Sequence, residues 1–320
     1  MMYRKRFVHS PSAELPQCHA PTIAELADGT LISAWYAGAH ERARNVAIYG
    51  AQLPACSDCW TPARVFADTP QLSEGNPVLF EDGRGLLWLF YVTMLGERWD
   101  TCQVKYSHSH DLGQTWAPPT IMHPEWGWMT GCKPLLRPDG AILLPLYDEQ
   151  GFAFVMRSED GGKEWKSSNQ IRTEAGVIQP TLAPLSDERL LMYLRTYEPV
   201  NGTIWQSYST DGGCTWAAPT RTNLPNPNSR VDLARLASGR LALAFNDTGH
   251  GRTPLTLALS EDDGATWPYR VNIETGPGEY SYPALIQSND GLLHLVYTYR
   301  RTHIAHIACD EEWILAHTST

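Results

Sequence analysis

A pattern of eight residues recurs four times along this chain, at intervals of about 50 residues. Each copy reads Ser-x-Asp-x-Gly-x-x-Trp, and the copies lie at 109–116, 158–165, 209–216 and 260–267. A fifth, degenerate copy lies at 57–60. A fixed period of roughly 20 to 50 residues is typical of repeat architectures, in which every repeat forms one supersecondary unit. The internal repeats therefore decide the architecture of this chain.

A second periodic signal supports the first. Short polar turns followed by apolar runs occur at 28–35, 82–91, 139–147, 187–194, 238–245 and 290–298. Each repeat thus supplies apolar strands joined by a turn and a further strand that leads into the Ser/Asp/Trp pattern, enough for a blade of four short strands. Such blades stack around a central channel because they cannot bury both faces alone. The sequence predicts an all-β fold, a six-bladed β-propeller with four-stranded antiparallel blades, as a single domain over residues 1–320.

The repeated pattern itself is typical of a structural turn. The Asp carboxylate and the Ser hydroxyl form hydrogen bonds within a tight turn, Gly adopts a conformation closed to side chains, and Trp packs on the sheet. We therefore assign no catalytic role to Asp111, Asp160, Asp211 or Asp262.

Charge and cysteine content exclude several classes of function. The formal charge of −10 disfavours nucleic acid and anionic membranes as partners, because both require a basic face. The N-terminal segment contains no apolar run of a signal peptide or membrane anchor, so the expected compartment is the cytoplasm. Cys56 and Cys59 form a single CxxC without a second ligand pair, and we interpret them as loop thiols. We assign no metal and no cofactor.

The first strand of each propeller blade begins near the axis, so polar residues at these strand heads are expected to share one pocket. The six heads are His19-Ala-Pro21, Asn76-Pro77, Lys133-Pro134, Gln179-Pro180, Ser229-Arg230 and Tyr282-Pro283. Strand ends are often polar, but a polar group at the same level of all six repeats favours a ligand site.

The repeats and several further segments resemble a known family. The Ser-x-Asp-x-Gly-x-x-Trp pattern matches the Asp-box turn of the sialidase (neuraminidase) superfamily. The segments HAPT, GNPVLF, IQPTL, LPNPNS, EYSYPALIQ and YTYRRTHIAH occur in the order found in its BNR-repeat-like bacterial and plant members. The resemblance spans nearly the whole chain and implies the same propeller fold.

The resemblance also implies a constellation of site residues. Sialidases bind the substrate carboxylate with three arginines, whose guanidinium forks match a carboxylate. Arg195 and Arg252 match the second and third, whereas His19 stands where the first is expected. Tyr282 matches the tyrosine nucleophile of the family, and Tyr280 is a neighbouring candidate.

Two carboxylates of the family pattern are replaced by amides in this chain. Gln179 matches the glutamate that takes the tyrosine proton, and Asn45 matches the acid/base aspartate. An amide can perform neither proton transfer. Candidates to replace them are His19, Glu41 and Glu279. The alternatives for these three are, in order, a hydrogen bond to a neighbouring strand, a solvated loop position and a turn cap.

Further candidates add charge or stacking surface to the pocket. The remaining polar strand heads are Asn76, Lys133 and Arg230. A sugar ring could stack on Trp99, Trp126 or Trp128, although packing within the blades is the favoured interpretation. We interpret 297–301 as the strand that closes the ring, with Arg301 as an alternative pocket residue.

Three functions fit these residues. The leading one is a sialidase-like exo-glycoside hydrolase with atypical acid/base residues, acting on a terminal sugar that carries a carboxylate, so the expected partner is a carbohydrate substrate. The second is a uronate-type polysaccharide lyase, in which Tyr282 and His19 move protons and arginines neutralise the carboxylate. The third is a carbohydrate-binding propeller without turnover, which the amides at Asn45 and Gln179 would also explain.

Overall fold

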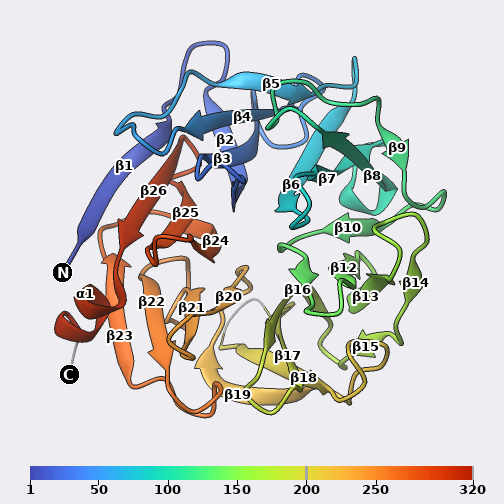
Figure 1. The fold of residues 1–320 in the computed structure, drawn as a ribbon. Helices are drawn as coiled ribbons and strands as arrows, with labels where there is room; N and C mark the ends of the chain where they lie inside the picture. The colour runs from blue at the N-terminus through green and yellow to red at the C-terminus, as the bar shows by residue number, and fades with distance from the viewer. Residues whose placement is uncertain (199–200, 319–320) are drawn as a thin grey trace.

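The computed structural model describes residues 1–198 and 201–318, and almost all of its regular structure is β-strand. Six antiparallel sheets are arranged in a ring around a central axis, as Figure 1 shows along that axis. The predicted six-bladed β-propeller is confirmed. None of the helices within the described ranges is long and apolar enough to cross a membrane.

The first three blades follow in chain order. Blade 1 contains β2 (Gln17–Glu25), β3 (Leu31–Gly38), β4 (Ala47–Leu53) and β5 (Arg64–Ala67). Blade 2 contains β6 (Ser73–Glu81), β7 (Leu87–Met94), β8 (Cys102–Ser109) and β9 (Thr120–Ile121), with the 3-10 helix η1 (Trp99–Thr101) before β8. Blade 3 contains β10 (Trp128–Thr130), β11 (Leu135–Leu136), β12 (Ile142–Asp148), β13 (Phe152–Ser158), β14 (Lys166–Ser167) and β15 (Ile171–Arg172).

The next three blades complete the ring. Blade 4 contains β16 (Val177–Pro184), β17 (Leu190–Thr196), β18 (Thr203–Ser209) and β19 (Thr220–Pro225). Blade 5 contains β20 (Asp232–Arg235), β21 (Leu241–Phe245), β22 (Leu255–Ser260) and β23 (Tyr269–Glu274). Blade 6 contains β24 (Tyr280–Gln287), β25 (Leu293–Tyr299), β26 (His303–Cys309) and β1 (Tyr3–His9), and helix α1 (Glu311–Ala316) follows β26.

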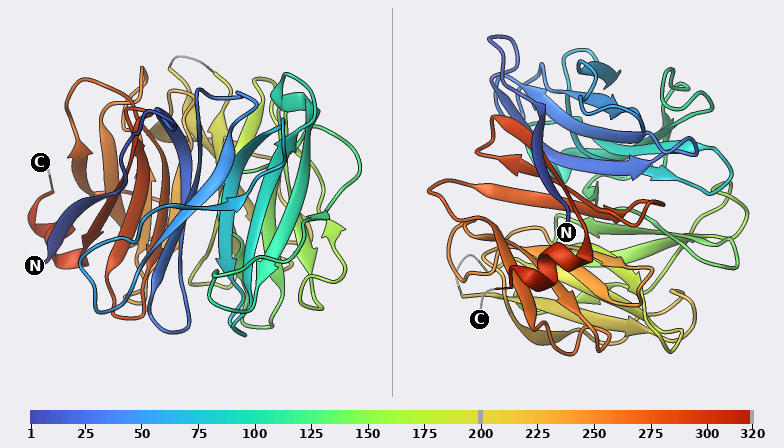
Figure 2. Two further views of the ribbon diagram at one scale, coloured as in Figure 1. Left: turned by 90° about the horizontal axis from the view of Figure 1, so that it is seen from above. Right: turned by 60° about the vertical axis from the view of Figure 1, so that its left-hand side comes forward.

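Blade 6 joins the two ends of the chain. Strand β1 pairs antiparallel with β26, from Tyr3 opposite Cys309 to His9 opposite Ile304, and Figure 2 shows the N-terminal strand beside the C-terminal strands. The segment 297–301 therefore does not close the ring by itself: it ends β25 and turns toward β26, and β1 supplies the closing strand. This pairing covers the edge that β26 would otherwise expose.

Blade 3 departs from the four-strand pattern because its inner and outer positions are each occupied by two short strands. Strands β10 and β11 both pair with β12, and β14 and β15 both pair with β13. The break between β10 and β11 contains Pro134, which has no N–H to donate to the ladder.

The Asp-box turns form the hydrogen bonds expected of them. In the copy at 109–116 the Ser109 hydroxyl donates to Asp111 over 2.7 Å and accepts from the Gly113 N–H over 2.8 Å. Asp111 also accepts from the Thr115 N–H over 2.8 Å. Gly113 has a φ of 77°, and a Cβ there would lie 2.8 Å from the Ile32 side chain. The Asp-box carboxylates therefore serve the turns and are not free for catalysis.

Four inner strands share an irregularity at the level where they reach the axis. Strands β2, β6, β16 and β24 each shift register there, and the shift contains a non-glycine residue of positive φ followed by proline. These residues are Ala20 (53°), Asn76 (44°), Gln179 (48°) and Tyr282 (54°). A left-handed conformation costs a residue with a side chain about 1–2 kcal/mol. Bulges of this kind re-aim side chains next to active sites.

Candidate functional site

All six blades contribute side chains to a cavity of about 250 Å³ at the axis. We call it the axial cavity. Its basic and acidic residues are Arg195, Arg252, Arg301, Glu41 and Glu149. Its other lining residues are Tyr36, Asn76, Trp99, Met129, Tyr147, Ile178, Tyr197 and Tyr282. The bulged inner strands thus bring Asn76 and Tyr282, far apart in the sequence, into one cavity.

Tyr282 lies among three guanidinium groups. The guanidinium carbons of Arg195, Arg252 and Arg230 lie 5.9, 5.5 and 5.3 Å from the centroid of its ring. Arg195 Nη1 also donates to the phenol oxygen over 3.1 Å. Burial alone would raise the pKa of Tyr282, but the charges of Arg195 and Arg252 outweigh it and hold the pKa below its usual value. The phenolate is therefore more accessible here than in water.

Arg195 is oriented by two amides. Its Nη1 donates to Gln179 Oε1 over 2.8 Å, and its Nε donates to Asn228 Oδ1 over 2.7 Å. Among the described residues no carboxylate forms an ion pair with Arg195. Because Gln179 is uncharged, Arg195 keeps its full positive charge for the phenol and for an anionic ligand.

Arg252 and Arg301 share one carboxylate partner, Glu279, on one side of the axial cavity. Arg252 Nη1 lies 2.7 Å from Glu279 Oε1, and Arg301 Nε lies 2.9 Å from Glu279 Oε2. Arg301 also forms an ion pair with Glu41. Burial would raise the pKa of Glu279, but the hydrogen bond from Arg301 and the charge of Arg252 hold it below its usual value. Glu279 is thus an ionised positioning residue behind the cavity wall.

Arg301 supplies a third guanidinium to the axial cavity from the turn between β25 and β26. The sequence places His19 where the resemblance expects the first arginine. The structure brings Arg301 beside Arg252 through their shared partner Glu279. The cavity therefore contains three arginines. One of them, Arg301, belongs to the segment 297–301, which the sequence predicts to be the ring-closing strand.

His19 lies behind Tyr282 and is only 3% exposed. The centroids of the two rings are 4.2 Å apart, and neither His19 nitrogen has a hydrogen-bond partner among the described residues. Burial lowers the pKa of His19 far below its usual value, and the charges of Arg301, Arg252, Arg230 and Arg195 lower it further. The imidazole is therefore neutral at pH 7 and a weak base.

Two of the sequence candidates point away from the axial cavity. Asn45 is exposed in the loop between β3 and β4, where its side chain accepts from the Ala39 N–H over 3.2 Å. The same loop directs Glu41 into the cavity instead. Lys133 Nζ lies 2.7 Å from Asp232 Oδ2, so its charge is neutralised by an ion pair outside the cavity lining.

The contacts of Arg230 and Tyr280 stabilise the fold and are not directed into the axial cavity. The Arg230 guanidinium is buried and donates to the carbonyl oxygens of Pro21 over 2.8 Å, Gly131 over 2.8 Å and Pro283 over 2.9 Å. It thereby joins the inner strands of blades 1 and 6 to the inner edge of blade 3, beneath Tyr282. Tyr280 is buried in the apolar core between blades 5 and 6 and does not line the axial cavity.

Only one of the three candidate tryptophans lines the axial cavity. Trp99, on η1, lines the axial cavity, where a sugar ring could pack against it. Trp128 stacks on His123 with centroids 3.7 Å apart and packs on Phe154. Trp126 is exposed.

Sequence reasoning missed several cavity residues, above all Glu149 and Tyr197. A usable signal was present: Glu149 follows the apolar run 139–147, just as Arg195 follows the run 187–194. Second strands of the blades end at the same rim of the ring, so the residues just after these runs lie near the axis. Within the described ranges, no three His, Cys, Asp or Glu side chains cluster as metal ligands.

The sequence of this chain is similar to those of known proteins. The family described as BNR repeat-like domain matches residues 29–295. A sialidase of Micromonospora viridifaciens is 28% identical over 214 residues, which are 59% of this chain and 32% of that protein. An anhydrosialidase of Macrobdella decora is 24% identical over 242 residues, 65% of this chain and 31% of that protein. The chain thus spans about a third of the length of these relatives.

Solved structures agree on the fold. The Hadza microbial sialidase Hz136 superposes with a TM-score of 0.84 at 20% identity, over 97% of this chain and 69% of that one. A protein of unknown function from Dyadobacter fermentans superposes with a TM-score of 0.81 at 17% identity, over 96% of this chain and 98% of that one. With the match over most of its length, the chain belongs to the BNR repeat-like family of the sialidase superfamily.

Proposed function

We propose that this protein is an exo-acting glycoside hydrolase that removes a terminal sugar bearing a carboxylate. The observation that carries the proposal is Tyr282, a phenol held among guanidinium groups inside the axial cavity. The matched relatives named as sialidases support the reaction class. A cavity of about 250 Å³ lies below the usual range of roughly 300–1,000 Å³ for ligand pockets, which favours one sugar ring.

The residues divide the work between binding and bond cleavage. Arg195, Arg252 and Arg301 bind the carboxylate, since guanidinium groups pair with carboxylates through charge-assisted hydrogen bonds. The same charges stabilise the phenolate of Tyr282, which attacks the anomeric carbon. A covalent sugar–tyrosine intermediate forms, and water then releases the sugar.

Elimination is the second candidate, because Asn45 and Gln179 stand where the sialidase pattern has carboxylates. In that reaction the Tyr282 phenolate removes the proton next to the carboxylate, and the arginines stabilise the resulting negative charge. A binding protein would use the same cavity without turnover.

One assay separates these functions. The protein is incubated with 4-nitrophenyl glycosides and disaccharides of acidic sugars, including sialic acid and uronic acids, and the products are separated by mass. Hydrolysis gives the free acidic sugar with one added water. Elimination gives an unsaturated sugar that absorbs in the near ultraviolet. No turnover of any acidic glycoside, together with saturable binding in a thermal-shift titration, would contradict the proposed hydrolase and favour a binding protein.

A further inference from the structure

The axial cavity contains two carboxyl side chains with unlike surroundings. Glu41 forms an ion pair with Arg301. Glu149 has no ion-pair partner among the described residues, and its side chain accepts one hydrogen bond, from the Tyr197 hydroxyl to Oε2 over 3.3 Å. When two carboxyls in one site have unlike surroundings, the one that is buried without a paired cation is the one that retains a proton and can act as the acid.

Glu149 is held rigidly at the cavity wall. It lies in the turn between β12 and β13, and its N–H donates to the Gly127 carbonyl over 3.0 Å. Asp148 accepts from the next N–H, that of Gln150, over 2.8 Å. The Glu149 side chain thus extends from a turn that hydrogen bonds hold in place between two strands. A general acid needs such a fixed position to donate its proton to the leaving-group oxygen.

Tyr197, the hydrogen-bond partner of Glu149, is also fixed. It follows β17 two residues after Arg195 and lies against glycines on two sides. A Cβ at Gly176 would lie 2.7 Å from the Tyr197 ring, and one at Gly151 would lie 3.2 Å from it. Glycine at these positions allows the ring to approach closely enough to reach Glu149.

Burial of Glu149 in the cavity wall favours its protonated form. Burial raises the pKa of Glu149, and Asp148 and Asp100 raise it further; the Tyr197 hydrogen bond and the Arg195 charge oppose this without cancelling it. A carboxylic acid with a raised pKa retains its proton closer to neutral pH and can donate it.

We propose that Glu149 is the general acid and base of this site, in place of the aspartate that Asn45 replaces. In the first step Tyr282, whose proton has gone to solvent, bonds to the anomeric carbon. The glycosidic C–O bond breaks, and the leaving oxygen takes the Glu149 proton. In the second step water attacks the anomeric carbon, Glu149 takes a proton from that water, and the bond to Tyr282 breaks. This assignment rests on the proposed hydrolase function.

The test is Glu149→Gln, with Glu41→Gln as the matched exchange of the other cavity carboxyl. Hydrolysis of an acidic disaccharide, whose leaving group needs a proton, is expected to fall about 10²–10⁴-fold in Glu149→Gln. The 4-nitrophenyl glycoside needs no proton to leave, so its first turnover stays rapid and appears as a burst of nitrophenolate. Azide, which needs no base, is expected to restore the slow second step. Glu41→Gln is expected to show no such dependence on the leaving group.

A second variant tests the same assignment if Glu149→Gln fails to fold. Tyr197→Phe removes a hydrogen bond that lowers the Glu149 pKa, so the alkaline limb of the kcat/KM profile is expected to move to higher pH. Equal losses on both leaving groups in Glu149→Gln, or an unmoved alkaline limb in Tyr197→Phe, would overturn the role of Glu149 while leaving a hydrolase that needs Tyr282. Absence of hydrolysis by the unmodified protein would overturn both proposals.

Discussion

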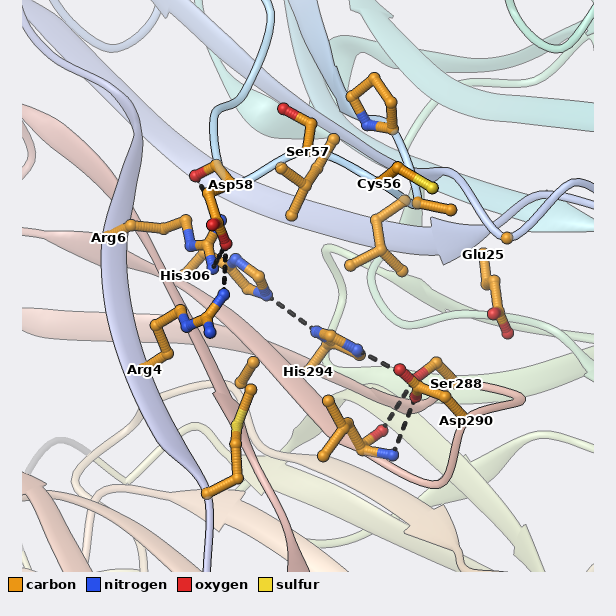
Figure 3. Close-up of a pocket in the computed structure, with 18 residues that line it drawn as sticks. Arg4, Arg6, Glu25, Cys56, Ser57, Asp58, Ser288, Asp290, His294 and His306 are labelled. Carbon is orange, nitrogen blue, oxygen red and sulfur yellow. Dashed lines mark hydrogen bonds and ion pairs between the residues drawn. The ribbon is translucent and has the colours of Figure 1, made fainter.

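Two regions of this protein contain buried histidines, and they differ in whether the ring nitrogens have hydrogen-bond partners. One is the wall of the axial cavity, where His19 lies behind the lining residue Tyr282 and its nitrogens have no partner among the described residues. The other, which we call the seam cavity, lies between blades 1 and 6 and is lined by residues including Arg6, Asp58, Ser288, His294 and His306 (Figure 3). At about 370 Å³ it is the larger of the two.

The seam histidines form a directed chain of hydrogen bonds. Trp60 Nε1, which can only donate, lies 3.3 Å from His306 Nδ1. His306 Nε2 must therefore donate to His294 Nδ1 over 3.0 Å, and His294 Nε2 donates to Ser288 Oγ over 2.9 Å (Figure 3). In this arrangement His294 cannot accept the Ser288 proton, which excludes an activated serine.

The histidines of the seam cavity form a structural network, whereas the axial cavity has the features of a ligand site. Every ring nitrogen in the seam is used by the protein, which joins the first blade to the last. Behind the axial cavity the His19 nitrogens are not used by the described protein, and within the cavity Arg195 has no ion-pair partner among the described residues, so its charge is left for a ligand. Cavity size does not distinguish the two, whereas the satisfaction of buried polar groups does.

The largest loss of activity is expected for Tyr282→Phe, which removes the phenol oxygen from the axial cavity and keeps the ring. Turnover of the acidic substrate is expected to fall by about a thousandfold or more, roughly 4 kcal/mol of transition-state stabilisation, because the nucleophile is lost. The measurement is kcat/KM together with the melting temperature. Ser288→Ala in the seam cavity is the control and is expected to keep full activity. Full activity of Tyr282→Phe would remove the phenol from the mechanism.

The pH dependence of stability tests the seam histidines. Burial lowers the pKa of His294 to about 4, with Asp290 opposing and Arg6 adding to the shift. An unfolded histidine binds a proton below about pH 6.5, and native His294 binds it only near pH 4. The free energy of unfolding is therefore expected to fall as the pH drops through this window, by about 3 kcal/mol for this histidine. His19 and His306 shift in the same direction.

Urea titrations at several pH values measure this fall, and His294→Gln serves as the comparison. In His294→Gln the free energy of unfolding is expected to depend less steeply on pH, because unfolding of this variant takes up one proton fewer. An unchanged slope would mean that His294 titrates normally in the native protein.

Replacing His306 in the seam cavity and His19 behind the axial cavity compares a hydrogen-bonded histidine with one that has no partner among the described residues. His306→Phe leaves the Trp60 N–H and His294 Nδ1 without a partner, so the free energy of unfolding is expected to fall by about 2 kcal/mol. His19→Phe breaks no hydrogen bond of the described protein, and a much smaller loss is expected. Urea denaturation gives both values. A larger loss for His19→Phe than for His306→Phe would reverse our interpretation of the two cavities.

The smallest expected effect concerns the carboxylate assignment. Arg195→Lys keeps the charge but loses the guanidinium fork, so affinity for a carboxylate sugar is expected to fall about tenfold, or 1.4 kcal/mol. A neutral analogue, with the carboxylate reduced to an alcohol, is expected to lose far less. Calorimetric titration of both sugars measures the difference. Equal losses would show that Arg195 does not bind the carboxylate.

Much of the fold and part of the site could be predicted from the sequence. The period of the Asp-box turns and of the apolar runs predicts six blades, because every blade repeats the same local interactions. The same repetition predicts that the strand heads Asn76 and Tyr282 share one pocket, and the resemblance to sialidases places Arg195 and Arg252 in it. The described structure brings these four together.

Other features depend on contacts between residues far apart in the chain, so they are seen in the folded protein and not in the sequence. The pairing of β1 with β26 joins the two ends, and Arg301 enters the axial cavity because that blade turns there. In the loop between β3 and β4, the hydrogen bond from the Ala39 N–H turns Asn45 outward while Glu41 faces Arg301. Local sequence determines repeating elements through local interactions. The side chains that enter a cavity are chosen by neighbours that no local pattern encodes.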